Sequence, residues 1–341
     1  MSIPLYFGPY GRSALEHVRE FAQVGVNAAW FHGFDPEAFE ACQKHGIAPC
    51  VELPTFRADF ASRPELIPTG IDGLPIRYGE LVQGVCLSKR DFLQEIEETL
   101  VDGLDAFRPA GIWLDYLTYA GWFETPDPDL QESCFCPDCI AEFCHATGID
   151  ATSPDLILRA YAVQWTRHKC ERIAAFAARY AGLIRSRRPG CVIGAYMCPW
   201  TPAEYNGALA RVFAQDYGLL APAVDVFTPL IYVQKSGRSP EWGRHFLAEA
   251  RDFVPHGRKV QLILDALDFP ESMLAVAESP NPSWGLQLYG GAEVFGDPER
   301  AKVFRVVVER IQARSSSGVE SDKEKPQGFP EPLGAVNLFR P

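Results

Sequence analysis

Alternation of strands and helices along almost the whole chain is the feature that most restricts the fold. Short apolar segments, typical of buried strands, are each followed by a segment whose apolar residues have helical spacing. The strand segments are apolar on both faces, as in a parallel sheet covered by helices. The predicted strands are IPLYFG (3–8), VNAAWFHG (26–33), IAPCVELP (47–54), GIWLDYL (111–117), CVIGAYMCP (191–199), VDVFTPLIYV (224–233), KVQLILDA (259–266) and SWGLQLYGG (283–291).

A helix is expected after each strand, so the sequence predicts an α/β protein with the fold of a (β/α)8 TIM barrel. An open, doubly wound sheet is the alternative. That fold usually carries a glycine-rich phosphate turn after its first strand, and GPYGRS (8–13) matches such a turn only weakly. The predicted helices span residues 13–25, 36–46, 89–107, 153–188, 203–220, 240–254, 270–279 and 297–314.

Two long segments interrupt this alternation, one after strand 3 (54–85) and one after strand 4 (118–152). Both are expected to be long loops at the end of the barrel where the strands terminate. The barrel is predicted to comprise residues 1–313 as one catalytic domain. Residues 314–341 begin RSSSGVESDKEKPQG, which has the composition of a linker, and are predicted to form a linker and a C-terminal tail.

Charge and hydrophobicity exclude some classes of partner. The chain has 32 Lys and Arg against 44 Asp and Glu, a net charge of −12, which argues against nucleic acid because phosphate binding needs clustered positive charge. No apolar run approaches the roughly 20 residues that span a bilayer, so no membrane partner is expected. The N-terminus resembles no secretory signal, which predicts a cytoplasmic protein. The sequence is compatible with a homo-oligomer.

Three cysteines lie close together in SCFCPDCIAEF (133–143) with the spacing C-x-C-x₂-C. Thiolates at this spacing can bind one tetrahedral ion, most often zinc. The fourth ligand is predicted to be Cys86, because the loops after strands 3 and 4 are neighbours in a barrel; Cys144 and His145 are alternatives. Four thiolates leave no open position, so the zinc would be structural; free or disulfide-linked cysteines are the other interpretation. The predicted metal ligands are Cys86, Cys134, Cys136 and Cys139.

Three carboxylates end otherwise apolar strands: Glu52 on strand 3, Asp115 on strand 4 and Asp265 on strand 7. Chemistry in this fold takes place at the C-terminal ends of the strands. Because side chains alternate along a strand, Trp113 and Asp115 are expected to share the inner face. Two carboxylates across a barrel mouth can cleave a glycosidic bond, so these three residues are the catalytic candidates. Glu52 or Asp265 can instead cap a helix or pair with an arginine such as Arg57.

Polar and aromatic side chains near the strand ends suit a sugar, whose ring stacks on aromatic faces while its hydroxyls need polar partners. His32 is expected to bind substrate or, with the carboxylates, a catalytic metal ion. For most of the aromatic residues, packing in the core is the alternative interpretation. The predicted substrate-binding residues are His32, Trp113, Tyr116, Tyr119, Tyr196 and Tyr232.

The segment GIWLDYLTYAG followed by SCFCPDCIAEF resembles uncharacterised glycosyl-hydrolase-like barrels, in which an LDYxRYP strand end precedes a CFCxxC loop. GVCLSKRDF and VDVFTPLIY resemble two further segments of that family, and the cysteine pattern is similar to the zinc site of family 42 β-galactosidases. The resemblance implies a glycosidase-like barrel with a structural zinc and Asp115 in the active site. The chain departs from the family at Thr118, where arginine is usual, and at Leu230, where glutamine is usual. Family 42 enzymes also place an Asn-Glu after strand 4, which this chain lacks.

The sequence therefore predicts a glycoside hydrolase that acts on a small carbohydrate or glycan, with zinc but no organic cofactor. Two other classes stay open. One is a lyase, an isomerase or a metal-dependent hydrolase built on the same barrel. The other is a carbohydrate-binding barrel without catalysis.

Overall fold

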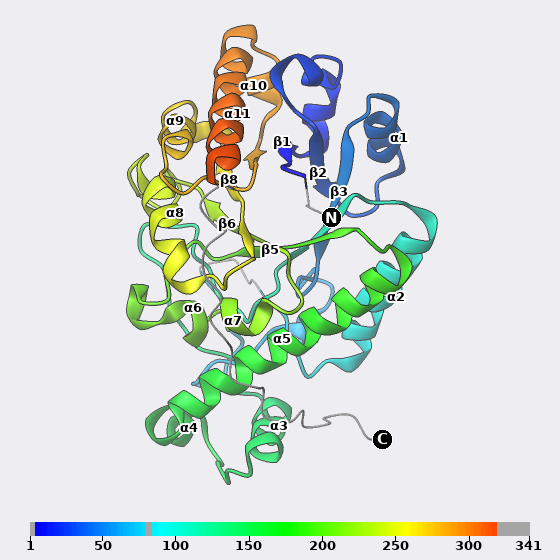
Figure 1. The fold of residues 1–341 in the computed structure, drawn as a ribbon. Helices are drawn as coiled ribbons and strands as arrows, with labels where there is room; N and C mark the ends of the chain where they lie inside the picture. Colours follow the sequence, from blue (N-terminus) through cyan, green and yellow to red (C-terminus); the bar gives the residue numbers. More distant parts are fainter. Residues whose placement is uncertain (1–3, 79–83, 319–341) are drawn as a thin grey trace.

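The computed structural model describes residues 4–78 and 84–318, and within them the strands form one closed parallel barrel (Figure 1). The sheet order is β5-β4-β3-β2-β1-β9-β8-β6, and the pairing of β5 with β6 closes it. Gln261 interrupts the seventh strand of the barrel, which therefore has two parts, β7 and β8. The strands are β1 Phe7–Tyr10, β2 Ala28–His32, β3 Ala48–Pro54, β4 Gly111–Asp115, β5 Val192–Met197, β6 Val226–Ile231, β7 Lys259–Val260, β8 Leu262–Asp265 and β9 Leu286–Tyr289.

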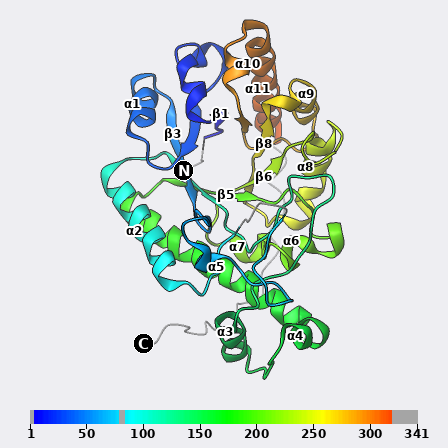
Figure 2. The ribbon, with the colours of Figure 1, turned by 180° about the vertical axis from the view of Figure 1, so that it is seen from behind.

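Helices cover the outside of the barrel, and α3 and α4 form a projection on one side of it (Figure 2). None of the helices in the described ranges is long and apolar enough to cross a membrane. The α-helices are α1 Pro36–Lys44, α2 Arg90–Ala106, α3 Pro137–Thr147, α4 Pro154–Ala160, α5 Ala162–Arg187, α6 Ala208–Arg211, α7 Tyr217–Leu220, α8 Trp242–Phe253, α9 Glu271–Ala277, α10 Ala292–Phe295 and α11 Pro298–Gly318; the 3-10 helices are η1 Arg12–His17, η2 Phe21–Val24, η3 Pro64–Leu66, η4 Glu204–Asn206 and η5 Ala266–Asp268.

The predicted (β/α)8 barrel with long loops after strands 3 and 4 is confirmed, but its first unit differs from the prediction. The first strand is β1 (Phe7–Tyr10) rather than residues 3–8, so Tyr10 ends it. The predicted helix 13–25 is replaced by η1 and η2. Its core-facing residues Leu15, Val18, Phe21 and Val24 recur every three positions, which is the period of a 3-10 helix rather than the roughly 3.6 of an α-helix.

Three other predicted boundaries also differ. The helix expected at 153–188 is divided at Tyr161 into α4 and α5. The helix expected at 203–220 is replaced by η4, α6 and α7, because Asn206 and Gly207 adopt left-handed backbone conformations that a helix cannot contain. The last helix, α11, runs to Gly318, so the predicted start of the linker at residue 314 falls inside it. The predicted tail at 319–341 lies outside the described residues.

The inside of the barrel is filled by large side chains, and its charged residues lie toward the C-terminal ends of the strands. Trp30 and Trp113 are fully buried, with their rings 5.3 Å apart in an edge-to-face contact. Trp113 Nε1 donates a hydrogen bond to Thr228 Oγ1 at 2.8 Å. His32, two residues after Trp30 on β2, is in register with Glu52, and Asp265 is in register with Tyr289. The packed indoles therefore form a floor, and the polar strand ends form a mouth above it.

Close packing around Trp113 predicts a clear contrast between two glycine substitutions. A Cβ at Gly194 would lie 2.3 Å from the Trp113 indole, whereas a Cβ at the exposed Gly182 of α5 meets no atom within 4 Å. Gly194→Ala should lower the free energy of unfolding by about 1–3 kcal/mol. Gly182→Ala should raise it by roughly 0.5–1 kcal/mol, because alanine favours the helix. Urea denaturation of both variants measures this; equal effects would contradict the described packing.

Candidate active site

Glu52 and Asp115 form a pair of carboxyl groups at the mouth of the barrel. Asp115 ends β4, and Glu52 lies two residues before the end of the neighbouring β3; the strands pair with Glu52 opposite Trp113 and Pro54 opposite Asp115. The two carboxyl groups are in hydrogen-bonding contact with each other. Two carboxylates this close repel each other, so the pair is expected to hold one proton.

Glu52 is held as the ionised member of the pair. Its side chain is 2% exposed, and burial alone would raise its pKa. Hydrogen bonds from His32 and Tyr10 outweigh that effect and lower the pKa. The Tyr10 hydroxyl donates to Glu52 Oε2, and His32 Nδ1 lies 3.3 Å from both carboxylate oxygens. The same contact with Glu52 raises the pKa of His32.

Asp115 is the member of the pair whose pKa is raised. Burial raises its pKa well above the ordinary value, and the negative charge of Glu52 raises it further. Its Oδ1 accepts a hydrogen bond from the backbone N–H of Tyr116 at 2.8 Å. Tyr116 has a φ of 53°, a left-handed conformation that is uncommon for a tyrosine and that turns the chain away at the end of β4. A carboxylic acid that is protonated near neutral pH can act as a general acid.

A second group of charges lies across the mouth. Asp265 ends β8, which is separated from β3 by β4, β5 and β6 on one side and by β2, β1 and β9 on the other. The ammonium group of Lys235 lies 2.9 Å from Asp265 Oδ2 and 3.7 Å from Glu124 Oε2. Asp265 Oδ1 also accepts from the backbone N–H of Leu267 at 3.0 Å, so the prediction that Asp265 can cap a helix is confirmed for η5.

Tyrosines connect the two charged groups. The ring of Tyr10 stacks on Tyr289, with centroids 5.4 Å apart, and Tyr289 lies 5.5 Å from Tyr232. Lys235 Nζ is 4.4 Å from the Tyr232 ring and 4.7 Å from the Tyr289 ring. Tyr289 is 38% exposed, so part of its ring is open to a ligand beside its contacts with Tyr10 and Lys235. The mouth therefore combines acidic groups with aromatic surface.

The structure brings most, but not all, of the predicted site residues to the mouth. Glu52, Asp115, Asp265, His32 and Tyr116 lie there. Tyr196 and Tyr232 are each 4% exposed and contribute to its floor, where the Tyr196 hydroxyl forms a 2.7 Å hydrogen bond with the side-chain amide of Gln287.

Two predicted substrate-binding residues lie away from the mouth. Trp113 is fully buried below it. Tyr119 is 2% exposed, and its hydroxyl accepts from Arg172 at 3.3 Å behind the barrel wall. Neither side chain presents surface to a ligand at the mouth.

Sequence reasoning missed Tyr10, Glu124 and Lys235. The boundary predicted for the first strand concealed Tyr10. Glu124 and Lys235 lie in loops, where no periodic pattern marks them.

The four predicted cysteine ligands converge at one point. The Sγ atoms of Cys86, Cys134, Cys136 and Cys139 all lie within 4.8 Å of one another. Cys86 Sγ is 3.6 Å from that of Cys134 and 3.7 Å from those of Cys136 and Cys139. Thiolates bound about 2.3 Å from one tetrahedral zinc ion lie about 3.8 Å apart. The cluster therefore has the spacing of a four-thiolate metal site.

Polar groups surround this cluster as they surround metal-bound thiolates. The backbone N–H of Thr69 donates to Cys134 Sγ at 3.2 Å, and Ser88 Oγ lies 3.0 Å from Cys86 Sγ. Arg172 Nη1 is 3.9 Å from Cys139 Sγ and brings a positive charge toward the thiolates. Cys144, an alternative ligand, instead donates to the carbonyl of Ala151 at 3.3 Å.

The cysteine cluster joins the two long loops that rise from β3 and β4. Cys86 lies at the end of the first loop, and Cys134 to Cys139 lie at the end of the second, which also carries Glu124. Glu132 adds a further attachment through ion pairs with the fully buried Lys169 at 3.3 Å and with Arg211 at 3.0 Å. Residues 116–136 are thus fixed both at β4 and at the cluster, which limits how far Glu124 can move from the mouth.

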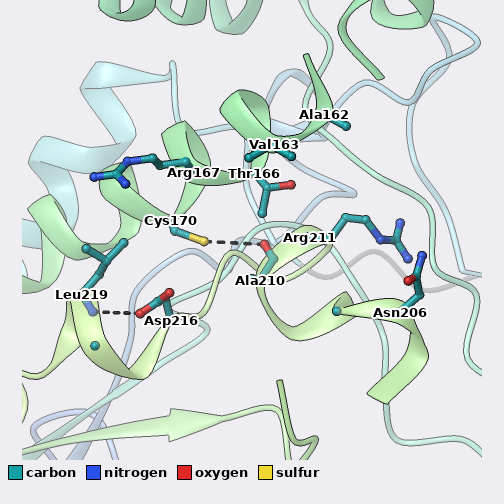
Figure 3. A pocket seen from close by; sticks show the side chains of 12 residues that line it. Ala162, Val163, Thr166, Arg167, Cys170, Asn206, Ala210, Arg211, Asp216 and Leu219 are labelled. Atoms are coloured by element: carbon teal, nitrogen blue, oxygen red, sulfur yellow. Dashed lines mark hydrogen bonds between the residues drawn. The ribbon is translucent and has the colours of Figure 1, made fainter. Parts of the chain in front are cut away.

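A groove of about 610 Å³ lies outside the barrel, between α5 and the segment that contains α6 and α7 (Figure 3). Arg167 and Arg211 are among the side chains that line it, and Cys170 donates to the carbonyl of Ala210 within it. None of the carboxyl groups at the mouth lines this groove. We place the candidate active site at the mouth because the interacting carboxyl groups lie there.

Comparison with solved structures identifies the same barrel in known enzymes. The glycoside hydrolase domain of PgaB (BpsB) from Bordetella bronchiseptica is similar over 89% of this chain and 99% of that domain, with a TM-score of 0.69 and 12% identity. A β-galactosidase from the psychrophilic Marinomonas ef1 is similar over 92% of this chain, with a TM-score of 0.64 and 11% identity.

A catalytic mutant of Gan42B, a family 42 β-galactosidase from G. stearothermophilus, is similar over 95% of this chain, with a TM-score of 0.60 and 13% identity. The chain spans 60% and 58% of the lengths of these two β-galactosidases. At these identities the likeness is one of fold. No protein-family model matches the chain, and no curated protein is significantly similar to it in sequence.

Packing beside the cysteine cluster predicts sensitivity to acid. His168 of α5 is 7% exposed between Trp165 and Phe143, and burial lowers its pKa to about 4. An unfolded histidine titrates near 6.5, so the unfolded chain binds the proton first and stability is lost as the pH falls from about 6.5 toward 4. Between pH 7 and pH 5 the wild type should lose about 2 kcal/mol more than His168→Phe. Urea denaturation at both pH values measures the difference; equal losses would contradict this assignment.

Proposed function

We propose that this protein is a glycoside hydrolase whose active site is the mouth of the barrel. The observation that carries the proposal is the buried pair of Asp115, whose pKa is raised, and Glu52, whose pKa is lowered, with the carboxylate of Asp265 across the mouth. Hydrolysis of a glycosidic bond needs an acid for the leaving oxygen and a carboxylate that stabilises or attacks the developing cation.

In the proposed reaction, Asp115 donates its proton to the glycosidic oxygen as that bond breaks. Glu52 cannot stand on the opposite side of the sugar, because its carboxylate contacts Asp115 directly. Its role is to hold the proton on Asp115 through its charge. Asp265 faces the pair from the other side of the barrel and is the candidate for the opposing carboxylate.

The surroundings support a carbohydrate as the substrate. Tyr289 offers an exposed ring, and Tyr10 and Tyr232 extend this aromatic surface. His32 and Arg57 lie near the carboxyl pair, where hydroxyl groups of a sugar need polar partners. The named activities of the structural neighbours, a glycoside hydrolase domain and β-galactosidases, agree with this proposal.

A metal-dependent reaction at the mouth is less well supported. In the described part of the chain, only the cysteine cluster brings three or more potential metal ligands together. His32 directs its Nδ1 at Glu52, which satisfies both groups without an ion. A barrel that binds glycans without hydrolysis is the alternative that the first experiment below detects.

The first test compares the wild type with Asp115→Asn on a panel of aryl glycosides and oligosaccharides. The variant should lose at least about 10²-fold in kcat/KM because it lacks the acid. Asp155→Asn is the matched control, since Asp155 is 73% exposed on α4, and it should keep full activity. Glycan binding by the wild type without any turnover would instead indicate a binding protein.

The pH profile of hydrolysis tests the assigned proton. Activity requires Asp115 protonated and Glu52 ionised, so it should fall at acidic pH when Glu52 gains a proton and at alkaline pH when Asp115 loses one. The raised pKa of Asp115 places the alkaline limb well above the ordinary range of an aspartic acid. In Glu52→Gln that limb should move to lower pH, because the charge that raises the pKa of Asp115 is gone. An unmoved limb would contradict the assignment.

We also propose that the cysteine cluster holds a structural zinc ion, supported by its four thiols and their tetrahedral spacing. Bound zinc would fix the two long loops and supply no chemistry at the mouth. Purified protein should contain one zinc per chain by elemental analysis, and Cys86→Ser should lose most of it and unfold at lower temperature. Cys144→Ser is the control and should keep its zinc. A zinc-free wild type with all four thiols reactive would overturn this proposal.

A further inference from the structure

Lys235 occupies a position that the proposed reaction does not yet explain. It lies at the tip of a tight turn after β6, in which Ser236 N–H donates to Tyr232 O at 3.0 Å. Asp268 fixes this turn from below by accepting from the backbone N–H groups of Val233 at 2.7 Å and Gln234 at 3.0 Å. The backbone that carries Lys235 is therefore rigid, and its side chain is directed by the structure around it.

The Lys235 side chain bridges segments that are distant in the sequence. Its ammonium group contacts Asp265 at the end of β8 and Glu124 in the loop after β4. The two loops also pack directly against each other, because a Cβ at Gly237 would lie 2.9 Å from the side chain of Pro126. The loop after β6 and the loop after β4 are thus in contact above the mouth, and Lys235 is the charged link between them.

Charges near Lys235 give this link a chemical consequence. Burial opposes the charge of Lys235, but the contact with Asp265 and the charge of Glu124 raise its pKa, so it is a cation at neutral pH. Burial raises the pKa of Glu124, and Lys235 acts in the opposite direction. Without the positive charge of Lys235, the negative charges of Glu124 and Asp265 would repel each other. The charge of Glu124 would also act on Asp115 with no cation to offset it.

We propose that Lys235 is a positioning residue, which holds Glu124 and Asp265 as two fixed carboxylates facing the reacting bond. It acts through these carboxylates and through the contact between the two loops. This inference rests on the proposed hydrolase function, and it adds Glu124 to the groups that form the mouth.

Lys235→Met removes the charge and keeps the length of the side chain, whereas Lys235→Arg can remake both ion pairs. Lys302→Met is the control, since Lys302 is 61% exposed on α11, where it pairs with Glu299 of the same helix. Lys235→Met should lower kcat by at least about tenfold with little change in KM. The proposed role needs Glu124 ionised as well as Glu52, so the acidic limb of the pH profile of this variant should move to higher pH, because Glu124 has lost the cation that lowers its pKa. Lys235→Arg should recover most of the activity and the original limb.

Hydrogen exchange provides a readout that needs no substrate. In Lys235→Met, residues 116–126 and 232–238 should exchange faster than in the wild type and in Lys302→Met. Glu124→Gln, which breaks one arm of the bridge, should have the same effect on 116–126 alone. If the wild type hydrolyses no glycoside, the proposed function fails while exchange still tests the bridge. Unchanged exchange, or a kinetic defect that Lys235→Arg does not relieve, would overturn the role of Lys235.

Discussion

Contact between the carboxyl groups of Glu52 and Asp115 determines how the rest of the mouth is arranged. Two negative charges at that distance in a buried site are unfavourable, so one proton must remain between them. Tyr10 and His32 donate to Glu52 and thereby leave the proton on Asp115. Lys235, Glu124 and Asp265 lie across the mouth from this asymmetric pair. The rings of Tyr10, Tyr289 and Tyr232 connect the two groups of charges.

The closed barrel is what brings these groups together. Glu52, Asp115 and Asp265 are far apart in the sequence, but each lies at or within two residues of the end of a parallel strand, and all such ends meet at one side of the barrel. In the described residues of the long loops after β3 and β4, regular backbone pairing is lacking over most of the length. The cysteine cluster and the buried Lys169 fix these loops from outside the barrel, so a site remote from the mouth supports the position of Glu124.

Much of this arrangement could be predicted from the sequence because periodic patterns carry it. Alternation along β4 placed Trp113 and Asp115 on the inner face, and the spacing of the cysteines identified the four thiols that converge.

Other parts of the site could not be predicted from the sequence, and the reasons are physical as well. The apolar segment used to predict the first strand ends at Gly8, whereas β1 begins at Phe7 and runs to Tyr10. Tyr10 was therefore not identified as a residue at a strand end. Trp113 and Tyr119 were predicted to bind substrate because aromatic residues near strand ends suit sugars, but packing below and behind the mouth buries them. Glu124 and Lys235 are loop residues, and only the folded chain shows that they meet.

The most direct test of this account is a carboxyl-carbon NMR titration of the folded protein, with Asp115→Asn and Glu52→Gln used to assign the two resonances. The account predicts that at pH 7 the Asp115 carboxyl group is still protonated while that of Glu52 is ionised, and that Asp115 titrates at a lower pH once Glu52 is replaced. An Asp115 that is fully ionised at pH 7 in the wild type would contradict the central claim, because the mouth would then hold no acid for the proposed reaction.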